Sequence, residues 1–249
     1  LHEIDEALQI NPALSRAIVL KADILFHHGN AEEAFGLLTE YQQKQPLDVP
    51  TLAALAAMFK ASGQLEESKA KYRRLADLEP DNTAWVNEAA ELAYSLGEED
   101  EALDSYLRVL ERDRESVAAH LRLFRIYLNR NDLAQARKFM EFLADKHPDN
   151  YEYNILAGIY WSDNREFEKA EEHFAKAAEI DPSEPLPYYH QGLLSVHRGA
   201  FKAACEGWKK ALLLSPPEDL ANRISHCLKL ATDLMDVLDR DMKTRREDG

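Results

Sequence analysis

Nine histidines and two cysteines are the side chains of this sequence best suited to metal binding or nucleophilic chemistry. His190 and His197 are seven residues apart, which on one helix separates them by about 10 Å, too far to share an ion without further ligands. We favour buried free thiols over a disulfide for Cys205 and Cys227. No metal-ligand spacing, phosphate-binding glycine loop or nucleophile elbow occurs, so we expect no catalytic residues, no metal site and no cofactor.

Arg122 and Arg125 form the most prominent basic pair of the sequence. Their guanidinium groups could hold an acidic group of a binding partner. The interpretation that we favour is structural, because Glu88 and Glu91 occupy the positions 34 residues earlier. Ion pairs Glu88–Arg122 and Glu91–Arg125 would then link neighbouring parts of the chain, and partly exposed pairs of this kind are common and individually weak.

The charge and the apolar pattern exclude two classes of partner. The 249 residues contain 30 Lys and Arg but 45 Asp and Glu, a formal charge of −15, whereas nucleic-acid-binding proteins usually present a basic face. No run approaches the roughly 18 apolar residues that a membrane-spanning helix needs. We therefore expect no nucleic acid partner and no direct membrane insertion. Free cysteines slightly favour a cytoplasmic location, with the periplasm as the alternative.

The elements that must position these residues repeat every 34 residues. Prolines recur at this interval, at Pro12, Pro46, Pro80, Pro148, Pro182 and Pro216. The one position of the series without a proline is 114, which is occupied by Arg114. A small residue usually stands eight places into each interval, and a bulky residue stands at place 24, at Leu38, Tyr72, Tyr106, Met140, Phe174 and Trp208. Small residues let two helices approach closely, bulky residues fill the groove beside them, and glycine or proline ends each helix. The pattern predicts an all-α chain of helix–turn–helix units.

One interval, 151–182, shows the full pattern with Ala157, Gly158, Trp161, Ala170, Phe174, Ala177 and Asp181–Pro182. This arrangement resembles the tetratricopeptide repeat family, whose pattern is W-x2-L-G-x2-Y, then A-x3-F, then P, on 34 residues. The resemblance implies a right-handed α-solenoid, a superhelix of antiparallel helix pairs. Phe124 at a small-residue place and Arg114 in place of proline depart from the pattern and indicate local repacking.

The repeat phase divides the chain into a half repeat, six repeats and a cap. Residues 1–12 correspond to the second helix of a truncated repeat, so we expect the natural chain to continue upstream. Six repeats fill 13–216, at about 15–46, 49–80, 83–114, 117–148, 151–182 and 185–216. Residues 217–249 form a capping helix, expected from Asp219 to about Arg240, and a tail, because a solenoid must show water a polar end face.

The resemblance implies that the first helix of each pair lines a concave groove that binds a protein or peptide partner. By their places in the repeat, the candidate partner-binding residues are Asn87, Glu91, Tyr94, Arg122, Arg125, Asn129, Tyr189 and His197.

The function predicted from these observations is that of a non-enzymatic interaction scaffold or adaptor. Two alternatives stay open. The chain could be the repeat region of a larger enzyme or of a bacterial envelope or polysaccharide-export assembly protein. It could also be a self-assembling scaffold, a homo-oligomer formed through the N-terminal half repeat.

Overall fold

The computed structural model describes residues 1–11 and 13–247, so the predicted repeat proline Pro12 and the end of the predicted tail, residues 248–249, lie outside the described residues. The described residues form fourteen α-helices and no strand. The predicted all-α fold of paired helices is therefore confirmed. The division into a half repeat, six repeats and a cap stays a prediction.

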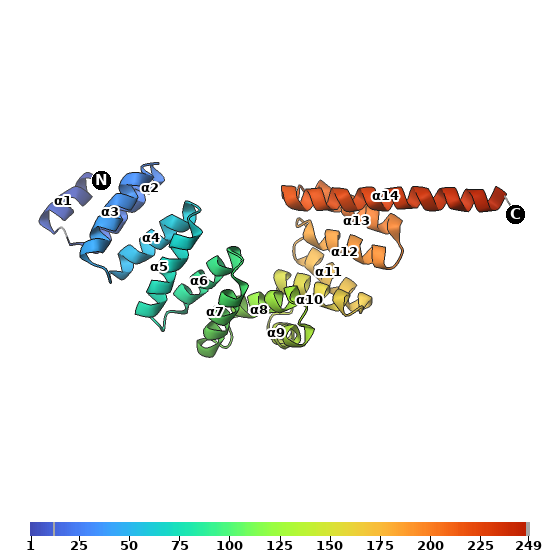
Figure 1. Ribbon diagram of the computed structural model, residues 1–249, viewed down its shortest axis with the longest axis horizontal. Helices are drawn as coiled ribbons and strands as arrows, with labels where there is room; N and C mark the ends of the chain where they lie inside the picture. Colours follow the sequence, from blue (N-terminus) through green and yellow to red (C-terminus); the bar gives the residue numbers. More distant parts are fainter. Residues whose placement is uncertain (12, 248–249) are drawn as a thin grey trace. The chain divides into compact units, whose positions relative to one another are not determined.

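The chain forms two compact units, and the boundary between them falls inside one helix, α8 (Val117–Asn129). Unit 1, Leu1–Leu123, contains α1 (His2–Ile10), α2 (Ser15–His27), α3 (Ala31–Lys44), α4 (Val49–Ala61), α5 (Leu65–Leu78), α6 (Thr83–Ser95), α7 (Glu99–Arg112) and the start of α8. Within this unit α2 packs on α3, α4 on α5, and α6 on α7 (Figure 1).

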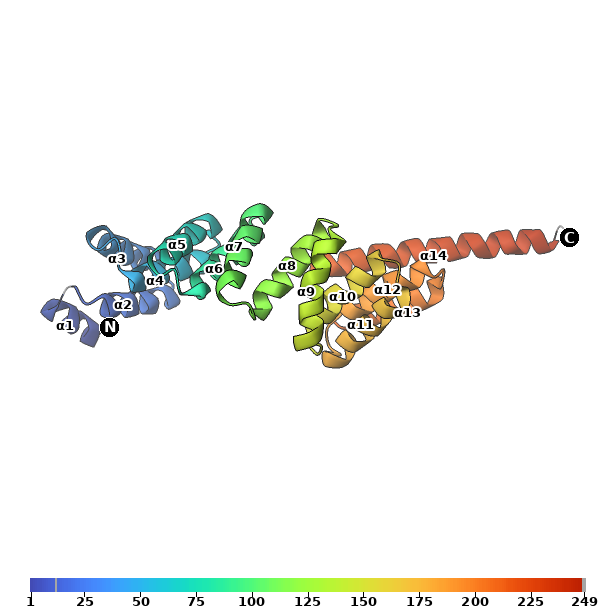
Figure 2. The same cartoon turned by 90° about the horizontal axis from the view of Figure 1, so that it is seen from below.

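Unit 2, Phe124–Gly249, is built in the same way from the remainder of the chain. Its elements are the rest of α8, then α9 (Leu133–Lys146), α10 (Tyr151–Asp163), α11 (Phe167–Ile180), α12 (Leu186–His197), α13 (Phe201–Leu213) and α14 (Glu218–Glu247). Here α10 packs on α11, α12 on α13, and α13 on α14 (Figure 2).

The turns inside the helix pairs share one geometry, in which a left-handed residue ends the first helix. Gly63 has φ 75°, and the N–H of the next residue, Gln64, donates to the Phe59 carbonyl oxygen at 2.9 Å, which is the bond that closes a Schellman turn. Arg165 takes the same conformation with φ 61°. Residues other than glycine pay a steric cost there, so the α10–α11 turn keeps the repeat geometry against the preference of its own residue.

The small and bulky columns of the sequence meet in the cores of the helix pairs. A Cβ atom built on Gly192 would lie 2.5 Å from Cδ1 of Trp208, and one built on Gly158 would lie 2.6 Å from Cδ1 of Phe174. The indole N–H of Trp208 donates to the backbone oxygen of Tyr189 at 3.1 Å. In these two pairs the bulky ring lies directly on the glycine backbone, which is why Gly158 and Gly192 leave no room for a larger residue.

The last helix, α14, packs on α13 at the end of unit 2. Leu220, Ile224 and Ala231 are buried in one cluster with Trp208. The helix runs to Glu247, beyond the predicted end near Arg240, and Leu238 in its second half is 43% exposed. The buried contacts of α14 therefore come from its first half.

His190 is a titratable group inside unit 2. Its ring stacks on Phe174 at 5.0 Å between centroids with 8° between planes, and meets Tyr189 edge-on at 5.2 Å. Burial, together with the nearby Arg223 charge, lowers the pKa of His190 to about 4. The folded state therefore holds a neutral imidazole here.

We expect Gly192→Ala to lower the free energy of unfolding by about 1–3 kcal/mol, because the added methyl must displace the Trp208 ring. The matched control is Gly36→Ala, where a Cβ meets nothing within 4 Å. That change should raise helix stability by about 0.5–1 kcal/mol through backbone entropy alone. Urea unfolding followed by circular dichroism measures both variants, and equal effects would contradict this account of the core.

We expect unit 2 to lose stability as the pH falls from 7 to 5. The pKa of His190 is lower in the folded chain than in the unfolded chain, so its stabilisation is complete above the unfolded pKa, near 6.5, and declines below it, by about 2 kcal/mol at pH 5. His190→Phe keeps a stacked ring and should flatten this dependence. Part of the slope should persist, because burial also lowers the pKa of His173. The exposed His226→Gln is the control and should behave as wild type.

Candidate functional site

The eight residues predicted from the sequence fall into two groups, one in each compact unit. The unit 1 group lies on α6 and the start of α8 and consists of Asn87, Glu91, Tyr94 and Arg122. The unit 2 group lies on α8 and α12 and consists of Arg125, Asn129, Tyr189 and His197. Each group is therefore described as a separate surface.

Helix α6 places Asn87, Glu91 and Tyr94 on one face. The helix begins after Asn82, whose side chain accepts a hydrogen bond from the Ala84 N–H at 3.3 Å. Spacings of four and three residues then bring the three side chains into one row. All three are half-buried. The Oδ1 atom of Asn87 is buried and has no hydrogen-bond partner, so this amide is held against the protein with an unused acceptor.

The carboxylate of Glu91 joins three helices of unit 1. Its Oε1 atom accepts two hydrogen bonds. The hydroxyl of Tyr106 on α7 donates one at 2.8 Å, and the Nε–H of Arg122 on α8 donates the other at 2.7 Å. Burial, followed by the adjacent Glu91, raises the pKa of Tyr106 far above its usual range. Glu91 and Arg122 therefore hold helices together, which favours the structural interpretation of these charges.

The ion pairs join other residues than the sequence predicted. Glu88 binds Lys60 at 2.6 Å, Glu91 binds Arg122, and Arg125 binds Glu152 at 2.7 Å. The partners are separated by 28, 31 and 27 residues along the chain, not by the 34 of the repeat. The first helices of neighbouring repeats are therefore shifted along their axes relative to each other. A side chain on one first helix pairs with a residue that lies about one to two helical turns before the equivalent position of the next repeat.

The remaining residues of α8 in the predicted site differ in their surroundings. Arg125 is half-buried, and its Nε atom is buried without a hydrogen-bond partner while Nη2 donates to Glu152. Asn129 is exposed. Arg125 is thus a structural link within unit 2, and Asn129 lies at the surface.

The structure buries most of Tyr189, and its contact with a partner stays a prediction. The side chain is only 9% exposed, and it lies in the same buried cluster as Leu220 and Ile224 of α14. The guanidinium carbon of Arg223, also on α14, lies 5.4 Å from the centre of the Tyr189 ring. Helix α14 therefore covers Tyr189 on α12.

His197, the last predicted residue, lies at a hollow of about 450 Å³. The hollow is lined by the end of α10, the following turn, the start of α11 and the end of α12, through Ser162, Asp163, Arg165, Phe167 and His197. The rings of Phe167 and His197 stack at 5.6 Å with 16° between planes. Burial raises the pKa of Asp163, and the His197 charge opposes this shift.

Sequence reasoning missed Arg165 and Phe167 as members of this hollow. The signal was present, because Arg165 occupies the turn place that Gly29, Gly63 and Gly97 occupy elsewhere. Arg165 has the left-handed backbone conformation of this turn and carries a charged side chain, whereas the corresponding residues of the other turns are uncharged. Only the structure shows that Arg165 lines the same hollow as His197 at the end of α12.

The described residues contain no group of three or more His, Cys, Asp or Glu side chains that could hold a metal ion. Over the same part of the chain, no helix combines the length and apolar character needed to cross a membrane.

Three regions of the chain match known families. Residues 1–92 match the family described as "Psidin, N-terminal TPR repeats region". Residues 100–159 and 153–184 match two families described as tetratricopeptide repeat.

A curated relative and two solved structures are similar to the chain. The human mitochondrial import receptor subunit TOM70 is 24% identical over 194 residues, which is 74% of this chain and 32% of that protein, so the chain spans about a third of its length. A tetratricopeptide repeat protein from Parabacteroides merdae has a TM-score of 0.65 at 17% identity, covering 93% of this chain and 90% of that one. YrrB, described as a TPR protein with an unusual peptide-binding site, has a TM-score of 0.55 at 17% identity, covering 76% and 97%. These likenesses show the fold.

A double-mutant cycle on Glu91→Gln and Arg122→Gln tests whether this pair is structural. The side chains are 36% and 28% exposed, so we expect a coupling of about 0.5–1 kcal/mol in the free energy of unfolding. Glu91→Gln should cost more than Arg122→Gln, since it also weakens the acceptor of the buried Tyr106 hydroxyl. Additive effects in urea unfolding would show that the pair does not stabilise unit 1.

Proposed function

Because this chain belongs to the tetratricopeptide repeat family, we propose that it is a non-enzymatic scaffold whose first helices bind a peptide or helix of a partner protein. The observation that carries the proposal is the hollow at the ends of α10 and α12, where an aromatic stack, a carboxylate and a guanidinium surround about 450 Å³. A recess of this composition suits a side chain that anchors a partner segment.

The chemistry of the hollow specifies the kind of anchor. The stacked rings of Phe167 and His197 offer apolar contact, and the exposed carboxylate of Asp163 lines the same hollow. An aliphatic side chain that carries a positive charge would satisfy both features, because its stem packs on the rings while its head meets the carboxylate. We therefore propose lysine or arginine of a partner segment as the preferred anchor in unit 2.

Unit 1 offers a shallower surface to a partner. On α4, Ala57 is exposed and small, and the neighbouring Lys60 is neutralised by Glu88 of α6. A partner's backbone can approach Ala57 closely, because this residue is small and exposed. On α6, half-buried Tyr94 supplies a polar aromatic edge to the first-helix surface.

The roles of the ionisable groups support a scaffold over an enzyme. Glu91 and Arg122 link helices, as do Arg125 and Glu152, so four charged groups of the first-helix surfaces act in structural pairs. The relatives agree with binding, because TOM70 is named as an import receptor and YrrB is described by its peptide-binding site. Both statements concern those proteins, and they support binding here by analogy.

Site-specific photo-crosslinking tests the proposal with the full chain in a cell extract. Benzoylphenylalanine at Ala57 and at Asp163 places a probe on first helices α4 and α10. The matched controls are the exposed Gln43 on α3 and Lys209 on α13, which are second helices. We expect crosslinked partner bands from the first-helix positions only.

His197→Ala should also reduce the crosslink from Asp163 several-fold, because it removes one ring of the stack, whereas His226→Ala on the exposed face of α14 should not. Crosslinks confined to Gln43 or Lys209, or a yield at Asp163 that is unaffected by His197→Ala, would contradict the proposed surface.

A further inference from the structure

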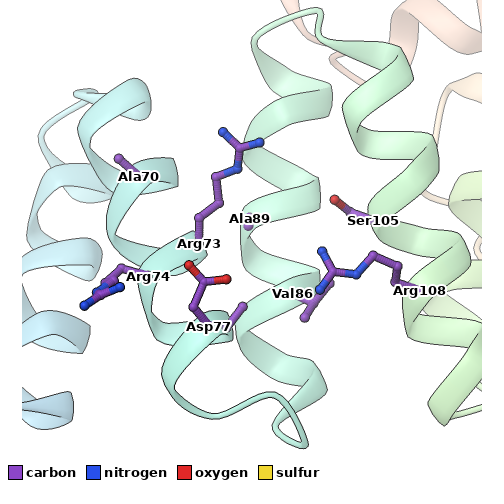
Figure 3. Close-up of a pocket in the computed structure, with 9 residues that line it drawn as sticks. Ala70, Arg73, Arg74, Asp77, Val86, Ala89, Ser105 and Arg108 are labelled. Atoms are coloured by element: carbon purple, nitrogen blue, oxygen red, sulfur yellow. The ribbon is translucent and has the colours of Figure 1, made fainter. Parts of the chain in front are cut away.

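A second hollow lies in unit 1 on the side formed by the second helices, α5 and α7, with α6 between them (Figure 3). Its volume is about 490 Å³. The floor consists of Val86 and Ala89 of α6, which are 7% and 5% exposed. The space exists because small residues, Ala70 and Ala76 of α5 and Ala89 of α6, stand where the helices come together.

The rim of this hollow is positively charged, although it lies in the most acidic part of the chain. Residues 1–114 contain 11 Lys and Arg against 22 Asp and Glu, yet the lining includes Arg73, Arg74 and Arg108 with Asp77 as its one acid. Figure 3 shows Arg73 and Asp77 from α5 and Arg108 from α7 reaching toward the space in front of α6, while Arg74 points away from α6. The local charge therefore opposes the charge of its surroundings.

The two arginines that face the space differ in what they already bind. Arg73 forms an ion pair with Glu101, with 3.1 Å between Nη2 and Oε1, and its side chain is 58% exposed. Arg108 is exposed and has no ion-pair partner within the described part of the chain. Ser105, one turn before Arg108 on α7, adds a hydroxyl to the same wall. An unpaired guanidinium beside an apolar floor is a binding group for a carboxylate, which its planar N–H pair can hold in a bidentate manner.

We propose that this hollow binds an acidic segment of a partner protein, with a glutamate or aspartate side chain on Arg108 and a neighbouring apolar side chain on Val86 and Ala89. A carboxylate fits better than a phosphate, because Asp77 on the same rim repels a dianion more strongly than a single negative charge. The site uses second helices, so it is separate from the first-helix surface proposed above, and either assignment can fail alone.

The test is an NMR titration of the full-length ¹⁵N-labelled chain, read at the arginine Nε–Hε signals. The probe is the peptide acetyl-Leu-Glu-Glu-Leu-Glu-Glu-Leu-amide, with the glutamine analogue and inorganic phosphate as separate arms. We expect the Arg108 signal to shift and saturate with the glutamate peptide, to shift little with the glutamine analogue, and to respond less to phosphate at equal concentration. Raising the salt concentration should weaken the peptide response.

Arg108→Gln should reduce the affinity for the glutamate peptide at least tenfold. Arg112→Gln is the matched control, since it removes the same charge one turn further along α7 without touching the hollow. An equal loss of affinity in both variants would show that the peptide responds only to the net charge of unit 1, and it would overturn the proposed site. A missing Arg108 response, or a stronger response to phosphate than to the peptide, would also overturn the proposal.

Discussion

The close contact between a bulky ring and a glycine backbone is the constraint on which the α10–α11 and α12–α13 pairs of unit 2 depend. Trp208 lies on Gly192 and Phe174 lies on Gly158, each within a distance that a Cβ atom could not share. This contact sets how near the two helices of a pair come, and the turn between them must then span that short gap. The left-handed residue at each turn follows from the same requirement, even where it is Arg165. Packing at native density tolerates little change in volume at such a point.

The offset between neighbouring helices decides what the charges on the first helices do. Since Lys60 meets Glu88, Glu91 meets Arg122, and Arg125 meets Glu152, most of the strong charges on these faces are already paired within one unit. What a partner meets there is a surface of small residues, neutralised pairs and ring edges. The second helices of unit 1 show the reverse, because Arg108 stands unpaired beside an apolar floor. The two sides of unit 1 therefore favour different kinds of ligand.

The capping helix changes the function of the residues it covers. Tyr189 lies in the buried cluster that includes α14, and the half-buried ring of His190 stacks on Phe174. Their role becomes one of stability, with a neutral His190 as part of the packed state. The hollow near His197 persists because it lies at the far ends of α10 and α12, next to the turn that carries Arg165.

The sequence by itself determined the helix pairs, their turns and the small and bulky columns, because these follow from spacing along one chain and from the size of each side chain. The 34-residue interval and residues such as Gly192 and Trp208 were sufficient for the fold class. Only the tertiary structure decided which charges pair, that Tyr189 is covered, that Arg165 and Phe167 join His197, and that three alanines leave a hollow under Arg108. Each of these depends on the angle and offset between helices from different repeats, and a periodic sequence specifies that such helices stack without specifying the register in which their side chains meet.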